Sequence, residues 1–170
     1  MRRSPASKRQ MLLPGAFDLQ DGKRVRTRAN PISHVRLLEE LSSKGVRSIV
    51  EIYRHEVLPA RTRSIRLLGR KCDARVVNTL LGFEVKASVR RILCPDQVTA
   101  RYLKIFAELG CPRIRVPYDP TLTSRIVPEI EASQTTLRVG VERLFQHSRA
   151  RRTYVLQRMY RLLRDKLRHD

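Results

Sequence analysis

The stretch that decides the fold runs from Asp73 to Lys86 and reads Asp-Ala-Arg-Val-Val-Asn-Thr-Leu-Leu-Gly-Phe-Glu-Val-Lys. Its second half alternates between apolar and polar residues, which is the pattern of a half-buried β-strand. Glu84 and Lys86 are two residues apart, so they share the polar face of that strand. If Asn78 and Thr79 form a two-residue hairpin loop, Asp73 lies directly opposite Glu84 on the neighbouring strand.

Two carboxylates that face each other across a sheet destabilise it unless a cation lies between them. Lys86 and a divalent metal ion are the cations that this register would bring there. The pattern therefore predicts either a metal site formed by Asp73 and Glu84 or an ordinary solvated strand face, and both interpretations stay open at this point.

The composition indicates one domain with a polyanionic partner. The 170 residues are 41% hydrophobic, which is enough for a single core with extensions. The 36 Lys and Arg residues against 16 Asp and Glu residues give a formal net charge of +20. Most of these bases are Arg, whose guanidinium binds phosphate through two parallel hydrogen bonds. We therefore expect nucleic acid, rather than a membrane surface, as the partner.

The sequence contains few signals that indicate a cellular compartment. No apolar run approaches the roughly 18 residues of a membrane-spanning helix, and no apolar segment follows the basic start, so we expect neither a membrane span nor a secretory signal. The three cysteines, Cys72, Cys94 and Cys111, are widely spaced and predict reduced thiols. A cytoplasmic or nucleoid-associated protein is favoured, and the acid-free residues 1–17 leave import into an organelle open.

The chain divides into three predicted segments: a basic arm over residues 1–29, an α+β core over 30–148, and a basic amphipathic helix over 149–170. In the core, helices are expected from Asn30 and from a capping box at Ser48. A helix from Asp96 to Gly110 and a long helix from Asp119 follow the strands, and Pro128 is expected to kink or restart the second of these. Strands are expected at about 64–69, 73–78, 82–89, 91–94 and 113–117.

The last helix has an apolar face formed by Leu156, Met159, Leu163 and Leu167. We expect this face to be buried against the domain or, through self-association, against a second subunit. Either arrangement leaves the arginines of the helix outward.

The predicted order of helix, three-stranded antiparallel meander, helix and strand resembles the PD-(D/E)XK nuclease superfamily, whose second and third strands carry an Asp and a Glu-x-Lys. The resemblance covers about residues 32–117. It implies that Asp73 and Glu84 bind Mg²⁺ and that Glu84 and Lys86 are catalytic. One departure is Cys72, which precedes Asp73 where the family has proline.

The resemblance also implies accessory roles for Gln97 and Tyr102, on the helix that follows the meander, although they are one residue further apart than in the family. Glu39 or Glu40 would supply the acid often found on the family's first helix.

Basic residues gather around the predicted sheet and on the last helix. They are candidate phosphate contacts, and otherwise a solvated face: Arg61, Arg63, Arg66, Arg70, Lys71, Arg75, Arg90, Arg91, Arg151, Arg158 and Arg161. The sequence thus predicts a nucleic-acid-binding protein with a nuclease-like core, a Mg²⁺-dependent endonuclease that cleaves phosphodiester bonds. The alternative is a non-catalytic RNA-binding or ribonucleoprotein-assembly protein.

Overall fold

The computed structural model describes residues 46–70 and 72–168. The predicted basic arm, the predicted first helix with Glu39 and Glu40, and Lys71 lie outside the described residues. No helix in the described part of the chain has the length and apolar content needed to cross a bilayer.

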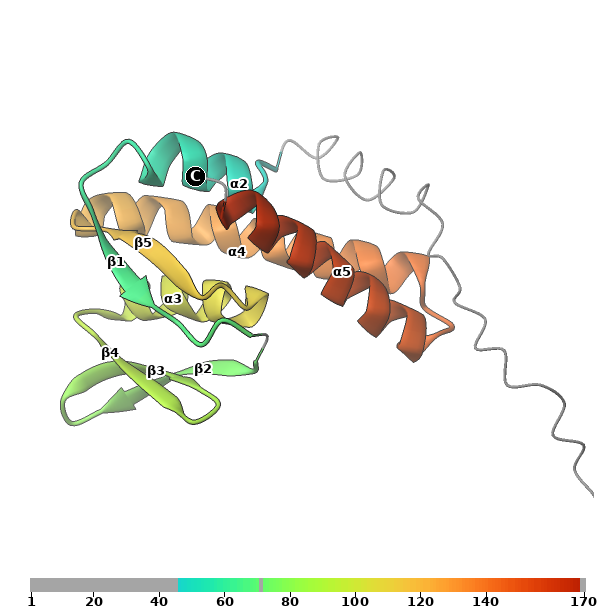
Figure 1. Ribbon diagram of the computed structural model, residues 1–170, viewed down its shortest axis with the longest axis horizontal. Helices are drawn as coiled ribbons and strands as arrows, with labels where there is room; N and C mark the ends of the chain where they lie inside the picture. The colour runs from blue at the N-terminus through green and yellow to red at the C-terminus, as the bar shows by residue number, and fades with distance from the viewer. Residues whose placement is uncertain (1–45, 71, 169–170) are drawn as a thin grey trace, which may run out of the picture.

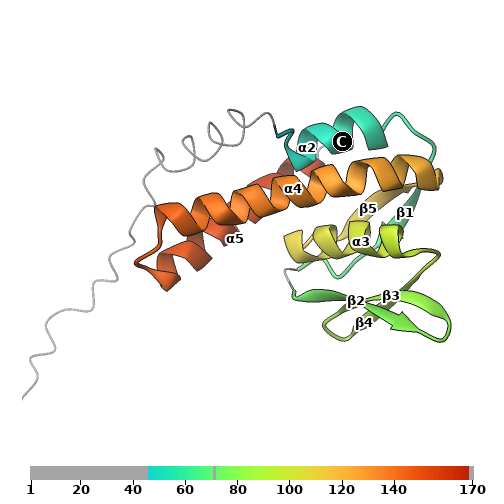
Figure 2. The same cartoon turned by 180° about the vertical axis from the view of Figure 1, so that it is seen from behind.

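The chain forms the mixed α+β fold that the sequence predicts. In chain order the elements are α2 (Ile49–Ile52), the π-helical turn η1 (Tyr53–Val57), β1 (Thr62–Arg66), β2 (Ala74–Thr79), β3 (Gly82–Ala87), β4 (Arg90–Cys94), α3 (Gln97–Leu109), β5 (Arg113–Pro117), α4 (Pro120–Leu144) and α5 (Arg149–Arg168). Figures 1 and 2 show α3 between the β2–β3–β4 sheet on one side and α2 and α4 on the other.

Helix ends follow the local signals in the sequence. Ser48 and Glu51 form the predicted capping box, in which the Ser48 N–H donates to Glu51 Oε2 at 2.7 Å and the Glu51 N–H donates to Ser48 Oγ at 3.2 Å. Asp96 and Asp119 cap α3 and α4 in the same way, by accepting backbone N–H groups. Gly110 ends α3 with φ at +79°, a left-handed conformation that glycine adopts without steric penalty.

The predicted restart at Pro128 is wrong, because α4 is one helix of 25 residues that continues through the proline, whereas the predicted kink stays a prediction. Pro128 is exposed, so its ring and the carbonyl that lacks an N–H donor lie on the solvent side. On the opposite side Ile126, Val127 and Ile130 are fully buried. Their packing holds the helix together across the proline.

The strands form two sheets. β2, β3 and β4 make the antiparallel meander, whereas β1 pairs with β5 in a separate two-stranded sheet. In the β2–β3–β4 sheet, the residues that face α3 include Ala74, Val85, Ala87 and Cys94, and all four are buried. The predicted alternation along β3 is therefore confirmed, but the strand ends at Ala87, so Val89, at the end of the predicted strand 82–89, lies in the following turn and is 88% exposed.

The predicted register of the β2–β3 hairpin is wrong. The turn is formed by Leu80 and Leu81 rather than by Asn78 and Thr79, so every pairing shifts by four residues. A two-residue hairpin turn needs positive φ values that β-branched Thr disfavours. Here Gly82 takes φ at +112° directly after the turn. Because four is an even number, the shift moves residues along the ladder but keeps each on its predicted face.

The centre of the core is an aromatic cluster on α3. Tyr102 and Phe106 have ring centroids 4.8 Å apart, and Phe106 lies 5.8 Å from Tyr53. The Tyr102 hydroxyl donates to the Arg115 carbonyl at 2.9 Å, and the Arg115 N–H donates to the Tyr53 hydroxyl at 3.1 Å. These two bonds satisfy the edge of β5 that β1 does not cover.

The last helix is part of the domain. Met159 and Leu167 are buried and Leu156 and Leu163 pack against the core, so the predicted burial of this face against the domain is confirmed. Val155 is buried beside them. Figure 1 shows α5 lying along α4. Self-association through this helix stays a prediction.

Candidate nucleic-acid interface

Glu84 and Lys86 share one face of β3 as predicted, but Asp73 does not lie opposite Glu84. In the observed ladder Arg75 is opposite Lys86 and Val77 is opposite Glu84. Asp73, which is exposed and precedes β2, lies two residues beyond Arg75, so it is four residue steps from Glu84 along the ladder. At ~3.3 Å per residue the separation is about 13 Å. Mg²⁺ binds its oxygen ligands at about 2.1 Å, so these two carboxylates do not fit a shared ion.

No other metal cluster replaces this pair within residues 46–70 and 72–168, where no three His, Cys, Asp or Glu side chains gather to hold an ion. The accessory residues also differ from the expectation. Gln97 is exposed at the start of α3 instead of pointing inward. Tyr102 is completely buried and bonded to the β5 backbone, so it supports the fold and does not reach a substrate.

The β2–β3–β4 sheet instead carries a row of three cations. Arg75 lies directly opposite Lys86, and Lys86 lies directly opposite Arg91, so the three occupy one line across the sheet. They are on the face turned away from α3, which no other described element covers (Figures 1 and 2). We call Arg75, Lys86 and Arg91 the cation row.

Nothing in the described chain neutralises the cation row fully. Arg91 Nη1 lies 3.9 Å from Glu84 Oε2, and the Arg91 side chain is 66% exposed. Arg75 and Lys86 have no acidic partner among the described residues. Like charges placed directly opposite each other destabilise a sheet. The row is therefore a place where a bound anion would stabilise the protein.

The two-stranded sheet also has a basic face. Arg66 is opposite Arg113, and Ser64 is opposite Arg115, so three exposed arginines share one face of β1 and β5. The Leu67 N–H donates to the Pro112 carbonyl at 2.8 Å. By the alternation of antiparallel ladders, Arg66 and Arg113 are then a non-hydrogen-bonded pair, in which side chains approach most closely. Sequence reasoning missed Arg113 and Arg115, although their alternation with Ile114 and Val116 in a predicted strand places them on its open face.

The remaining predicted strand-region arginines differ in their surroundings. Arg61 lies over the Tyr118 ring, with its guanidinium carbon 5.3 Å from the ring centre. Arg63 is half-buried, and its Nε has no hydrogen-bond partner in the described chain. Arg70 is exposed in the connection between β1 and β2.

Arg90 links the two sheets. Its Nη1 donates to the Leu67 carbonyl at 3.3 Å, which ties the first residue of β4 to the residue that follows β1. Because Arg90 pairs with the buried Ala87, it is on the α3 side of its sheet, so this bond joins the two sheets on the side opposite the cation row.

Acidic residues of the helices, by contrast, are bound to arginines. Glu56 accepts hydrogen bonds from Arg47 at 3.0 Å and Arg125 at 2.6 Å, and these bonds, the one to Arg47 first, hold the pKa of Glu56 below its ordinary value. Glu131 binds Arg101 in the same manner. The strands contain eight bases and a single acid, Glu84. Helix α5 has the same balance, eight bases and Asp165, so the excess positive charge of the described residues lies on the strands and on α5.

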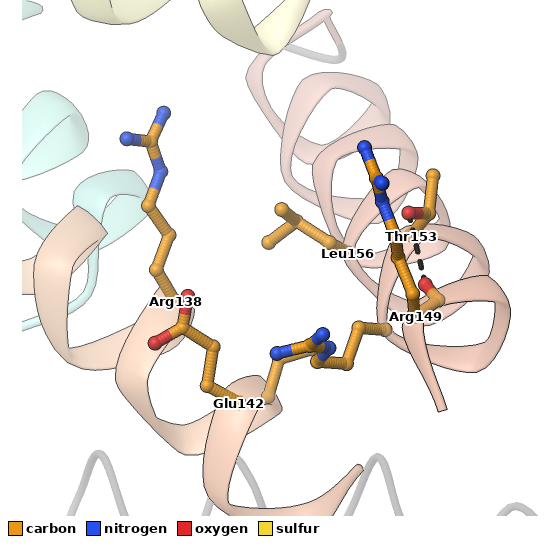
Figure 3. A pocket seen from close by; sticks show the side chains of 7 residues that line it. Arg138, Glu142, Arg149, Thr153 and Leu156 are labelled. Atoms are coloured by element: carbon orange, nitrogen blue, oxygen red, sulfur yellow. Dashed lines mark hydrogen bonds between the residues drawn. The ribbon is translucent and has the colours of Figure 1, made fainter. Parts of the chain in front are cut away.

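A second basic site is a cleft of about 420 Å³ between α4 and α5. Figure 3 shows Arg138 and Arg149 on opposite sides of it, with Leu156 between them. Arg152 also lines the cleft, but Glu142 does as well. Arg138 is already bound to Glu108 at 2.7 Å and to the Tyr160 hydroxyl at 2.9 Å. This cleft is consequently a weaker anion site than the cation row.

The predicted contacts on α5, Arg151, Arg158 and Arg161, are exposed. They belong to a different element from the strands, and the described structure does not bring them into the cation row.

The cysteines are structural. Burial raises the pKa of Cys94 to about 11 and that of Cys111 to about 12, so both stay protonated at neutral pH. Burial also raises the pKa of Cys72, whose thiol lies 3.7 Å from the Ala107 carbonyl. None of the three has the environment of a nucleophile.

No family model, curated protein or solved structure matches this chain. The resemblance to the PD-(D/E)XK nucleases therefore depends on the Glu84-x-Lys86 pattern and the predicted element order alone.

Proposed function

We propose that this protein binds nucleic acid through the basic surface of its two sheets and does not use Asp73, Glu84 and Lys86 to cleave it. The observation that carries the proposal is the cation row. Three bases stand in line across three strands on an open face. The acids next to the row are Glu84, whose Oε2 is 3.9 Å from Arg91 Nη1, and the exposed Asp73, two residues before Arg75, so bases outnumber acids there.

The chemistry of a polyphosphate fits this surface. Adjacent strands are ~4.8 Å apart, so the row spans about 10 Å and can contact successive phosphates of one backbone. The exposed Arg66, Arg113 and Arg115 extend the same charge over the neighbouring sheet. The net charge of +20 adds attraction at long range, which is sensitive to salt.

The endonuclease hypothesis receives less support, because the register separates Asp73 from Glu84. Glu84 is instead the acid closest to Arg91, where it limits repulsion within the row. The non-catalytic alternative, an RNA-binding or ribonucleoprotein-assembly protein, requires only the basic surface.

The test compares the wild-type protein with the triple variant Arg75→Gln, Lys86→Gln, Arg91→Gln in binding to labelled DNA and RNA at several salt concentrations. Removing three phosphate contacts should reduce the slope of log affinity against log salt by about 2.7 for a duplex, and affinity by roughly tenfold or more. The matched control is Arg151→Gln, Arg158→Gln, Arg161→Gln, which removes the same charge from α5. An equal loss in both variants would mean that binding is diffuse and not located on the sheets.

The same substrates incubated with Mg²⁺ or Mn²⁺ test the endonuclease hypothesis. We expect no cleavage by the wild-type protein. Metal-dependent cleavage that disappears in Glu84→Gln but not in the α5 control would establish the nuclease instead.

A further inference from the structure

The connection between β2 and β3 is an apolar tip. Leu80 and Leu81 form the turn, and they are 106% and 80% exposed. Tight hairpin turns usually contain Asn, Asp or Gly, because these residues accept the required backbone angles and are well solvated. Two adjacent leucines in such a turn expose apolar surface without contributing to the core. Because Gly82 carries the positive φ after the turn, neither the turn backbone nor the core requires leucine at these two positions, which indicates a role outside the fold.

The outward face of the sheet changes character along the hairpin. Nearest the tip is the pair Thr79 and Gly82, and next comes a line formed by Val77, Glu84 and Leu93, of which Leu93 is 61% exposed. The cation row follows two residues further on. An apolar tip and a phosphate-binding row thus lie on one rigid hairpin.

We propose that this hairpin is a wedge that inserts Leu80 and Leu81 between base steps of double-helical DNA from the minor groove, while the cation row binds phosphates beside the insertion. The inference rests on the proposed function, since it names the form of nucleic acid that the same surface binds. Apolar side chains that enter the minor groove unstack a base step and kink the duplex.

A duplex fits the face better than a single strand does. Proteins that bind single strands stack bases on aromatic side chains. The aromatic residue of this hairpin, Phe83, pairs with Asn78 and Cys94 on the α3 side, where it packs against the core. The outward residues of the sheet are aliphatic or charged, and such side chains act as wedges rather than as stacking platforms.

The spacing also favours DNA over a lipid bilayer. Five residues separate Arg75 from Leu80, which is about 17 Å along the strand. Apolar groups that enter a bilayer interface lie only about 5–10 Å below the headgroups, so an end-on hairpin would hold the cation row beyond the lipid phosphates. On a duplex the hairpin would lie along the minor groove with only its tip turned inward, so the same 17 Å covers about five steps of 3.4 Å and keeps the cation row beside backbone phosphates.

A second copy of the chain does not fit the outward face of this sheet well. A two-fold contact through this face would bring the same patch of both subunits together. The cation row of one subunit would then lie close to that of the other, with one Glu84 from each to offset three bases. Like charges in that arrangement repel.

The experiment uses the full chain and a short DNA duplex with 2-aminopurine at central TA steps, which unstack most easily. Unstacking increases 2-aminopurine fluorescence. We expect the wild-type protein to raise it about twofold or more, and Leu80→Ser/Leu81→Ser to bind with an affinity within roughly threefold of wild type but without the rise. Both leucines are exposed, so the substitutions leave the core intact. The matched control is Val139→Ser/Leu162→Ser, which removes two exposed apolar residues from α4 and α5 and should keep the wild-type rise.

Four outcomes overturn the wedge. The first is duplex binding without any fluorescence rise, which leaves the proposed function in place. The second is binding to phosphatidylserine vesicles that depends on Leu80 and Leu81, with no unstacking of DNA. The third is a dimer that dissociates in the leucine variant, again with no unstacking of DNA. The fourth is no binding to any nucleic acid, in which case the proposed function fails as well.

Discussion

Helices α2, α3 and α4 differ from the strands in how their charges are paired. Around α2, α3 and α4, acids and bases alternate in space and bind one another, as in the Arg47 contacts with Glu56 at 3.0 Å and Glu129 at 2.5 Å. The strands place bases opposite bases, with Arg75 against Lys86 and Arg66 against Arg113. Paired charges mainly support a fold, whereas unpaired charges of one sign attract a partner. Net charge alone therefore does not locate a binding surface, because charges that pair with each other must first be separated from those that do not.

The residues that stabilise the fold differ from those that we propose bind nucleic acid. Helix α3 contacts both sheets and α4, so the core depends on it. The cation row contributes nothing favourable to the fold on its own. Substitutions in the two regions should therefore have different readouts.

The largest effect is expected from the aromatic cluster. Phe106→Ala removes a fully buried ring that contacts Tyr53 and Tyr102, and it should lower the free energy of unfolding by about 3–5 kcal/mol. Urea denaturation monitored by circular dichroism measures this loss. An effect below about 1 kcal/mol would show that α3 is not the centre of the core.

A smaller loss is expected from a paired acid between the helices. Glu108 accepts from Gln134 at 2.9 Å and from Arg138 at 2.7 Å, and its side chain is only 13% exposed. Glu108→Gln should lower the free energy of unfolding by about 1–3 kcal/mol, because it leaves Arg138 poorly compensated. Nucleic-acid affinity should stay within roughly twofold of wild type. Glu142→Gln, at an exposed acid of the same helical region, is the control for the loss of one negative charge.

The capping box gives a prediction about pH. Hydrogen bonds from the Ser48 backbone and side chain lower the pKa of Glu51. Since the folded-state pKa lies below the unfolded one, the stabilisation is present above the unfolded value of about 4.5 and is lost as the pH falls through the folded value. Glu51→Ala removes the carboxylate, so it should lower stability by about 1 kcal/mol at neutral pH and by less at pH 3, where the carboxylate is protonated in the wild-type protein as well. Thermal unfolding at both pH values tests this, and an equal loss at both would contradict the role of the carboxylate.

The smallest change in stability is expected within the cation row. Lys86→Gln removes one of three aligned cations, so the free energy of unfolding should change by no more than about 0.5 kcal/mol, and in the stabilising direction. Nucleic-acid affinity should fall in the same variant. A clear destabilisation would mean that Lys86 has a structural partner, and the contrast between strands and helices would then fail at this position.

The structural features that the sequence predicted correctly depend on interactions between residues close together in the chain. Three predicted features that depend on neighbours within a few residues were confirmed. They are the capping box at Ser48, the end of α3 at Gly110 and the strand at Arg113–Pro117. The faces of β3 were predictable for the same reason, since alternation depends only on the strand itself. Candidate phosphate contacts such as Arg75 and Arg91 could be named, but their alignment in one row could not.

The sequence by itself determined the α+β class, the faces of the helices and strands, and the excess of arginine from which we infer an anionic partner. The tertiary structure alone decided which strands pair and in what register. A shift of four residues leaves every face unchanged, so the hydrophobic pattern does not distinguish the two registers. The turn at Leu80 and Leu81 and the ladder it starts move Asp73 away from Glu84 and place Lys86 between Arg75 and Arg91. A pattern that predicts a metal site in one register thus becomes a row of cations in the other, because function depends on which residues meet across the sheet.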